Sequence, residues 1–265
     1  MKRKDIIFSL FIGLMILMVS CDSIIDEKFL ENNATVEEVE LVATQNESNG
    51  NLIELSMNTP GVTGYWDYNL GKALTNRVEF VYPIPGTSTF TYVGTLGGEF
   101  FEKTIDVQVD VLDTPLDQDW YNLVSENTAE GKAWVFAGAG GDEGLWWFMS
   151  PPGNPDQYLS VWWNAGGTCC PPADAAGRMV FDLDGAANYT YYSAPDAAPQ
   201  SGSFVLDVAN RTLQIGGGLD ILGAPDDRKS PSGIYQIISL TEEELILYVP
   251  NNAGGTGWTW VFRPE

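Results

Sequence analysis

The sequence of 265 residues contains no histidine. This absence excludes catalytic centres that depend on a histidine base, such as Ser-His-Asp and Cys-His systems, and it removes the commonest zinc ligand. An enzyme with this sequence would have to work with carboxylates alone, as glycosidases do. No predicted strand carries a spaced carboxylate motif, so the sequence favours a protein without enzymatic activity.

Basic residues are also scarce, with 13 Lys and Arg against 36 Asp and Glu. Residues 1–20 hold three of the basic residues and one of the acidic ones, so the chain from residue 21 onward has 10 against 35, a formal charge of −25. The lack of a basic patch excludes a nucleic-acid partner, and the acidity repels anionic glycans. A neutral ligand fits this charge best, although acidity that serves only solubility would look the same.

Residues 6–19 form an uncharged run dominated by Ile, Leu, Phe and Met, after a basic start at residues 2–4. As a helix this run would measure about 21 Å, less than the roughly 30 Å of a membrane core. The pattern is typical of an export signal. Residues 17–21 resemble a lipobox, in which a small residue such as Ser20 precedes the cysteine that becomes lipid-bearing. The resemblance implies that Cys21 is the membrane anchor; an ordinary signal peptide with a stray cysteine is the alternative.

Residues 22–34 are polar and acidic without periodicity, which predicts a tether. Asp22, Asp26 and Glu27 resemble the acidic surface-export signal of Bacteroidetes lipoproteins. This resemblance implies an outer-membrane lipoprotein that faces the cell exterior, although a solvated tether would have a similar sequence.

Cysteine is rare, and lipidation of Cys21 would leave only Cys169 and Cys170. An exported protein lies where thiols can oxidise, so these neighbours could form a vicinal disulfide. Such a ring is strained, because ordinary disulfides need a wider separation of the Cα atoms. Two free thiols are therefore the alternative.

The chain is rich in glycine, proline and aromatic residues, which predicts an all-β protein of short strands. Residues 105–111 alternate strictly between apolar and polar, as in a half-buried strand. The polar, proline-containing segment 112–117 predicts a boundary between a first domain at residues 35–112 and a second domain at residues 117–265.

The first domain resembles polycystic-kidney-disease (PKD) domains. Residues 66–71 (Trp-Asp-Tyr-Asn-Leu-Gly) are similar to the family's Trp-Asp hairpin, and residues 80–87 are similar to its aromatic strand and Pro-Gly turn. The resemblance implies an immunoglobulin-like sandwich that acts as a spacer, with Trp66 in its core.

The second domain shows a short helical pattern at residues 120–125 and then many short strands separated by turn signals. These strands are expected at residues 133–137, 144–149, 158–163, 178–183, 188–192, 203–208, 212–215, 234–239, 244–249 and 258–263. Strands without helices predict an antiparallel sandwich such as a jelly roll, with a closed, lipocalin-like barrel as the alternative. Trp258, Trp260 and Phe262 share one strand face and are expected in the core.

Eight of the nine tryptophans lie from residue 120 onward, where stacking on sugar rings is therefore expected. Alternation along residues 159–164 places Trp163 in the core and Trp162 and Asn164 on the opposite face, so Trp162 is the main predicted platform. Trp146 and Trp147 are predicted to lie one inward and one outward, or both buried. The predicted ligand-binding residues are Trp162, Trp146, Trp147, Asn164, Tyr158 and Asp142.

Residues 182–185 (Asp-Leu-Asp-Gly) look like half of a calcium loop but lack the terminal glutamate of an EF-hand. A bound structural calcium ion therefore remains an alternative for this segment. No other cofactor is expected.

Residues 132–136, Trp162-Trp163, residues 238–245 and residues 260–262 together resemble the C-terminal domain of surface glycan-binding lipoproteins from Bacteroidetes polysaccharide-utilisation systems. This family implies capture of a neutral polysaccharide or oligosaccharide, with a laminarin-type β-1,3-glucan as the best choice, before uptake by an outer-membrane glycan transporter. The alternatives are a surface adhesion or structural lipoprotein and, less favoured, a carboxylate-only glycoside hydrolase.

Overall fold

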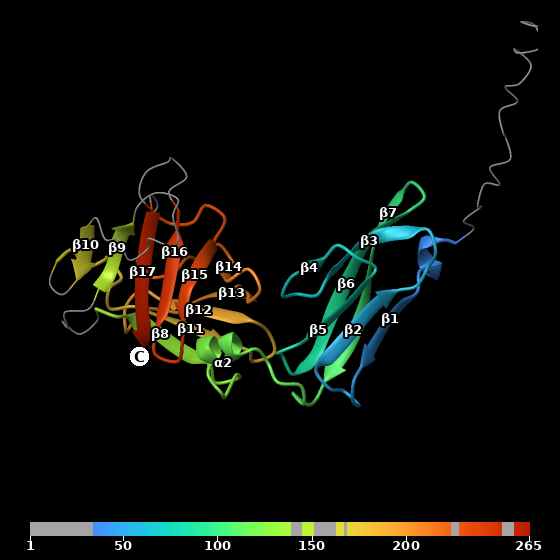
Figure 1. Ribbon diagram of the computed structural model, residues 1–265, viewed down its shortest axis with the longest axis horizontal. Helices are drawn as coiled ribbons and strands as arrows, with labels where there is room; N and C mark the ends of the chain where they lie inside the picture. Colours follow the sequence, from blue (N-terminus) through green and yellow to red (C-terminus); the bar gives the residue numbers. More distant parts are fainter. Residues whose placement is uncertain (1–33, 139–144, 151–162, 167–168, 224–227, 251–256) are drawn as a thin grey trace, which may run out of the picture. The chain divides into compact units, whose positions relative to one another are not determined.

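The computed structural model describes residues 34–138, 145–150, 163–166, 169–223, 228–250 and 257–265. In segments 145–150 and 163–166 it describes the backbone and the side chain of Trp146 only. Residues 34–265 form one compact unit. Figure 1 shows two groups of strands in this unit, and the all-β prediction is confirmed. Within the described ranges, no helix is long and apolar enough to cross a membrane.

The first group of strands, here called the sandwich, has two antiparallel sheets preceded by the 3-10 helix η1 (Val36–Glu38). The three-stranded sheet has the order β1 (Leu41–Gln45), β2 (Leu52–Met57) and β5 (Arg77–Val81). The four-stranded sheet has the order β4 (Lys72–Ala73), β3 (Val62–Asp67), β6 (Gly86–Leu96) and β7 (Glu99–Val109).

The core of the sandwich follows the alternation of its strands. In β2, every second residue is buried, and Ile53 and Leu55 have no exposed surface. Trp66 of β3 is also fully buried, which confirms the prediction that it is a core residue. Its ring meets that of Tyr92 edge to face, with 5.2 Å between centroids, and its indole nitrogen donates a hydrogen bond to the Asn76 carbonyl at 3.2 Å.

The segment predicted as a domain boundary is attached to the sandwich. The buried Asn51 side chain donates to the Thr114 carbonyl at 2.9 Å and accepts from the Thr114 amide at 2.8 Å. Asp113 also accepts a hydrogen bond from the Asn51 amide at 3.3 Å. The chain is therefore fixed to the sandwich as far as Thr114, three residues before Asp117, the N-cap of the next helix.

The second group of strands closes into a barrel of eight, because the last strand pairs with the first. Its members are β8 (Lys132–Phe136), β11 (Arg178–Asp182), β12 (Asn188–Tyr192), β13 (Gln200–Asp207), β14 (Thr212–Ile215), β15 (Ile234–Leu240), β16 (Leu245–Val249) and β17 (Gly257–Pro264). The preferred prediction of an open sandwich or jelly roll was thus wrong here, and the closed-barrel alternative is confirmed.

Barrel closure depends on β17, which is shared between two partners on one side. Its C-terminal part pairs with β8, and its N-terminal part pairs with β9 (Leu145–Ser150). Strand β9 thereby continues the line of β8 after an insertion, and β10 (Trp163–Gly166) pairs with the outer edge of β9. Strand β9 therefore extends the barrel wall along β17, although neither β9 nor β10 belongs to the closed ring of eight strands (Figure 1).

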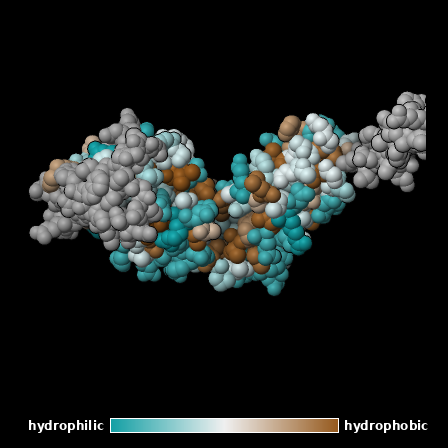
Figure 2. Space-filling view, turned by 45° about the horizontal axis from the view of Figure 1, so that its top comes forward, coloured by the Kyte–Doolittle hydropathy of each residue, from teal (hydrophilic) through white to brown (hydrophobic). Residues whose placement is uncertain are grey.

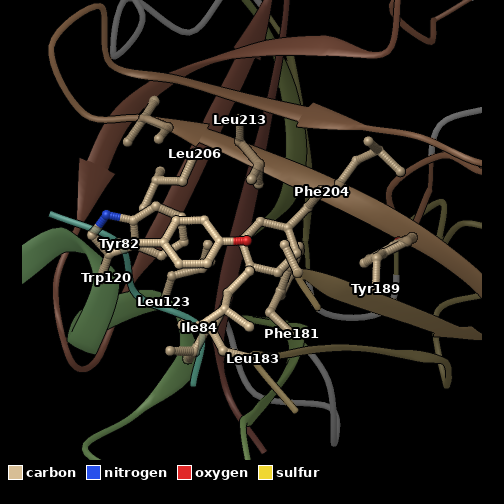
Figure 3. Close-up of a cluster of buried hydrophobic side chains, with 14 of the residues drawn as sticks. Tyr82, Ile84, Trp120, Leu123, Phe181, Leu183, Tyr189, Phe204, Leu206 and Leu213 are labelled. Carbon is tan, nitrogen blue, oxygen red and sulfur yellow. The ribbon is translucent and has the colours of Figure 1, made fainter. Parts of the chain in front are cut away.

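Aromatic and aliphatic side chains fill the described interior of the barrel (Figure 3). The ring of Phe181 lies 5.0 Å from that of Tyr189 and 5.3 Å from that of Phe204. Trp260 and Phe262 are fully buried, as predicted, whereas Trp258 of the same face is partly buried.

The helix α2 (Gln118–Val124) confirms the short helix expected at residues 120–125. It begins earlier than expected because the Asp117 carboxylate accepts a hydrogen bond from the Asp119 amide at 2.9 Å and caps the helix. The helix is joined to the barrel by Trp134, whose indole nitrogen donates to the Leu123 carbonyl at 2.9 Å.

Two tyrosines of β12 link barrel stability to pH. The Tyr189 hydroxyl donates to the Asp220 carbonyl at 2.7 Å, and the Tyr191 hydroxyl donates to the Asp174 carboxylate at 2.7 Å. Burial, the larger cause in both, raises the pKa of each tyrosine above the ordinary value of 10.0, and nearby carboxylates raise it further.

A raised pKa means that the unfolded chain loses these protons at lower pH than the folded one. The stabilisation should be fully present below about pH 10 and be lost as the pH rises through the folded-state pKa values. We expect denaturant midpoints to fall as the pH rises above about 10 in the wild type, and to fall less steeply in the double variant Tyr189→Phe, Tyr191→Phe. Equal pH dependence of the two proteins would contradict this assignment.

Candidate functional site

The described surface is hollowed between the β3–β4 hairpin of the sandwich and the β13–β14 hairpin of the barrel (Figure 2). This pocket, here called the groove, has a volume of about 610 Å³. Both modules line it, with Tyr68, Leu70, Gly71, Lys72, Phe80 and Val81 from the sandwich and Trp120, residues 205–210, Thr212, Gln214 and Ile234 from the barrel. Its size falls within the usual range for small-ligand sites.

The sandwich wall of the groove carries a pair of stacked aromatic rings. The rings of Tyr68 and Phe80 lie 4.6 Å apart at an angle of 26°. Both side chains are partly buried, and Phe80 in turn meets Phe90 edge to face at 5.6 Å. Tyr68 is therefore supported by aromatic residues that continue into the core.

The turn after β3 positions Tyr68. The Tyr68 amide donates to the Gly71 carbonyl at 3.1 Å, and the Asp67 carboxylate accepts from the Asn69 amide at 3.2 Å. Asn69 has a positive φ of 71°, a conformation that asparagine tolerates better than most residues. Gly71 leaves room for the ring, because a Cβ there would lie 2.6 Å from the Tyr68 hydroxyl oxygen.

The barrel wall of the groove is mixed, with apolar residues such as Trp120, Val208 and Ile234 beside a polar part that comprises Asp207, Asn210, Thr212 and Gln214. The Asp207 carboxylate accepts hydrogen bonds from both the amide and the side chain of Asn210, at 2.9 and 2.8 Å. These bonds fix the carboxylate at the end of β13. Gln214 of β14 adds an exposed amide to the same wall. Burial, followed by the charges of Asp207 and Asp67, raises the pKa of Tyr68.

This arrangement suits a ligand with an apolar face and a hydroxyl-rich rim. Aromatic rings can pack on C–H surfaces, while carboxylate and amide groups hydrogen-bond to hydroxyls. Among the described lining residues Asp207 is the one carboxylate, whereas the usual glycosidase mechanism needs two, about 5–9.5 Å apart.

Most ligand residues predicted from the sequence fall outside what the structure describes. Trp162, Tyr158 and Asp142 lie outside the described residues, as does Cys21. Trp147 and Asn164 lie on β9 and β10, and nothing is described of their side chains. The strand expected at residues 158–163 is described only from residue 163 onward, as β10.

Trp146 is a correction to the predicted platform. It is only 6% exposed and packs edge-on against Phe136, with 5.6 Å between the ring centroids. Because β9 continues the wall of the barrel beside β17, this side chain joins the core. Trp146 is thus an inward-facing core residue and not an exposed stacking surface.

The structure joins Cys169 and Cys170 in a vicinal disulfide. Both residues are exposed, and Cys170 has a positive φ of 58°. The loop that follows is anchored by Asp174, whose carboxylate accepts hydrogen bonds from the Gly223 amide and the Tyr191 hydroxyl.

The calcium-like segment 182–185 forms the turn between β11 and β12. One Asp182 oxygen accepts hydrogen bonds from the Asn188 side chain at 2.7 Å and the Asp184 amide at 3.0 Å. The chain itself therefore holds this turn. A search confined to the described residues finds no group of three or more His, Cys, Asp or Glu side chains that could hold a metal ion.

The sequence did not predict the groove, because lining residues such as Tyr68 and Asp207 are more than 100 residues apart in the chain. Tyr68 was visible as part of the PKD-like hairpin, and its partner Phe80 as part of the next aromatic strand. Comparisons with known protein families and with curated proteins find no match for this chain.

Proposed function

We propose that the protein is a lipid-anchored surface protein that binds a neutral polysaccharide without cleaving it. A laminarin-type β-1,3-glucan is the proposed ligand, and an outer-membrane transporter is the proposed next recipient. The observation that carries the proposal is the groove, whose lining combines a stacked aromatic pair with the polar side chains of Asp207, Asn210 and Gln214.

Charge and composition support a neutral ligand. The chain from residue 21 onward has a formal charge of −25, which would repel anionic glycans. The groove lining carries one cation, Lys72, and one carboxylate, Asp207, so it has no formal net charge. In this proposal Cys21 provides the anchor, and the sandwich is an immunoglobulin-like, PKD-type domain that holds the barrel away from the membrane.

Affinity electrophoresis tests the proposal. The chain from residue 21 onward, with Cys21→Ser to prevent lipidation, should be retarded in gels that contain laminarin and run normally in gels that contain alginate or no glycan. The panel should also include other β-glucans, α-glucans and mannan.

In a host that processes lipoproteins, the wild-type precursor should fractionate with membranes and its Cys21→Ser variant should not.

Three results bear on this proposal separately. Retardation by one neutral glycan supports binding, and turnover of that glycan would contradict the non-enzymatic assignment. Normal migration with every neutral glycan would contradict the ligand class. Equal membrane fractions for wild type and Cys21→Ser would contradict the anchor alone.

A further inference from the structure

We propose that the sandwich is half of the glycan site, with one sugar chain bound in the groove between the Tyr68 ring and the polar wall formed by Asp207 and Gln214. This inference rests on the proposed function and adds a location to it. It differs from the spacer role that the PKD resemblance implies, because the sandwich then contacts the ligand directly.

The first support is the fixed orientation of the aromatic pair. Phe80 is held from the side of the core by Tyr82 and Phe90, whose rings meet it edge to face at 6.1 and 5.6 Å. Tyr68 stacks on this supported ring. A platform that is already ordered loses little side-chain entropy on binding, which favours affinity.

The second support is the burial of the aromatic pair at the pocket wall. Tyr68 and Phe80 both line the groove while remaining partly buried against the core. The exposed part of these two rings offers apolar surface that a ligand can contact without any rearrangement of the core. Contact with the C–H face of a sugar would remove that surface from water, which is favourable.

The third support is the hydrogen-bonding character of the opposite wall. Each Asp207 oxygen accepts one hydrogen bond from Asn210, which leaves further acceptor capacity on both oxygens. The Gln214 amide can donate and accept at the same surface. This wall suits hydroxyl groups, which also donate and accept.

The fourth support is the chain connection between the walls. Thr114 is bound to Asn51 of the sandwich by two hydrogen bonds, and α2 begins soon after it with Trp120 in the groove lining. The segment that connects the two modules lining the groove is therefore short, and its first part is hydrogen-bonded to the sandwich.

The test uses the chain from residue 21 onward with Cys21→Ser, and titration calorimetry with laminarin or the panel glycan that retards it. Tyr68→Ala should weaken binding about tenfold, the usual effect of removing a central aromatic contact. Tyr68→Phe keeps the ring and should remain within about threefold of the parent. Gln214→Ala, on the other wall, should weaken binding about threefold or more.

Phe100→Ala is the matched control, because Phe100 is an aromatic residue of the same sandwich that is 84% exposed and lies outside the groove lining. This variant should bind like the parent. Circular dichroism melts identify variants that fail to fold, and Gln214→Ala tests the groove even if Tyr68→Ala does not fold.

The outcomes separate the two proposals. Parent binding that is weakened by groove variants but not by Phe100→Ala supports the site. Parent binding that survives Tyr68→Ala and Gln214→Ala overturns the groove assignment while glycan binding stands. A parent chain that binds no neutral glycan overturns the proposed function, and the groove assignment with it.

Discussion

Trp134→Ala is expected to lower the free energy of unfolding of the barrel by about 3–5 kcal/mol, as is usual when a large core aromatic is truncated. Trp134 is fully buried on β8. The substitution would leave a cavity beside β11 and β17, the two strands with which β8 pairs. It would also remove the hydrogen bond from the indole nitrogen to the Leu123 carbonyl, which joins α2 to the barrel.

Urea unfolding followed by circular dichroism measures this effect. Trp134→Phe retains most of the volume but not the hydrogen bond, so its loss should be smaller than that of Trp134→Ala. Leu74→Ala is a surface control at a side chain that is 82% exposed, and it should change stability by less than about 0.5 kcal/mol. A Trp134→Ala protein as stable as the Leu74→Ala protein would show that β8 does not close the barrel as described.

Gly64→Ala is expected to destabilise the sandwich by about 1–3 kcal/mol or more through overpacking. Gly64 of β3 lies opposite Gly94 of β6. A Cβ at position 64 would approach the Val93 carbonyl oxygen to 2.1 Å and the Gly94 Cα atom to 2.7 Å. Both are backbone atoms, so β3 and β6 would have to separate, and the nearby contact of Trp66 with Tyr92 would be disturbed.

Gly98→Ala is a control from the β6–β7 turn, where a Cβ would meet nothing within 4 Å. Its melting temperature should stay close to that of the wild type, whereas that of Gly64→Ala should fall by several degrees. Equal melting temperatures for the two variants would mean that the close approach of β3 and β6 is not required for stability.

Local patterns predicted most strands of this protein. Residues 188–192 and 212–215 match β12 and β14 residue for residue, because each is a short run rich in aromatic, β-branched or alternating residues and is bounded by clear turn signals. Trp260 was correctly placed in the core by the alternation of its strand, and Trp66 by the resemblance to PKD domains. These successes rest on interactions that are close in sequence.

Barrel closure and the groove could not be read from such patterns. Closure depends on β17 pairing with β8, which lies more than 100 residues earlier in the chain. The alternation of apolar and polar residues along a strand is the same in a closed barrel and in an open sandwich, so it could not predict this pairing. Trp146 was ambiguous for a related reason, because burial on β9 depends on Phe136 in another strand. Tyr68 and Asp207 share the groove only after both modules have folded.

The attachment of Thr114 to Asn51 sets how the two groove walls meet a common ligand. Only Pro115 and Leu116 separate Thr114 from the Asp117 helix cap, so the second wall is tethered by a very short linker. A sugar chain bound to one wall would meet the other at an effective concentration in the millimolar range or above. Two weak surfaces would then bind as one site. Inserting residues into the linker at Pro115 and Leu116 would lower the overall affinity for the sugar chain without changing either surface.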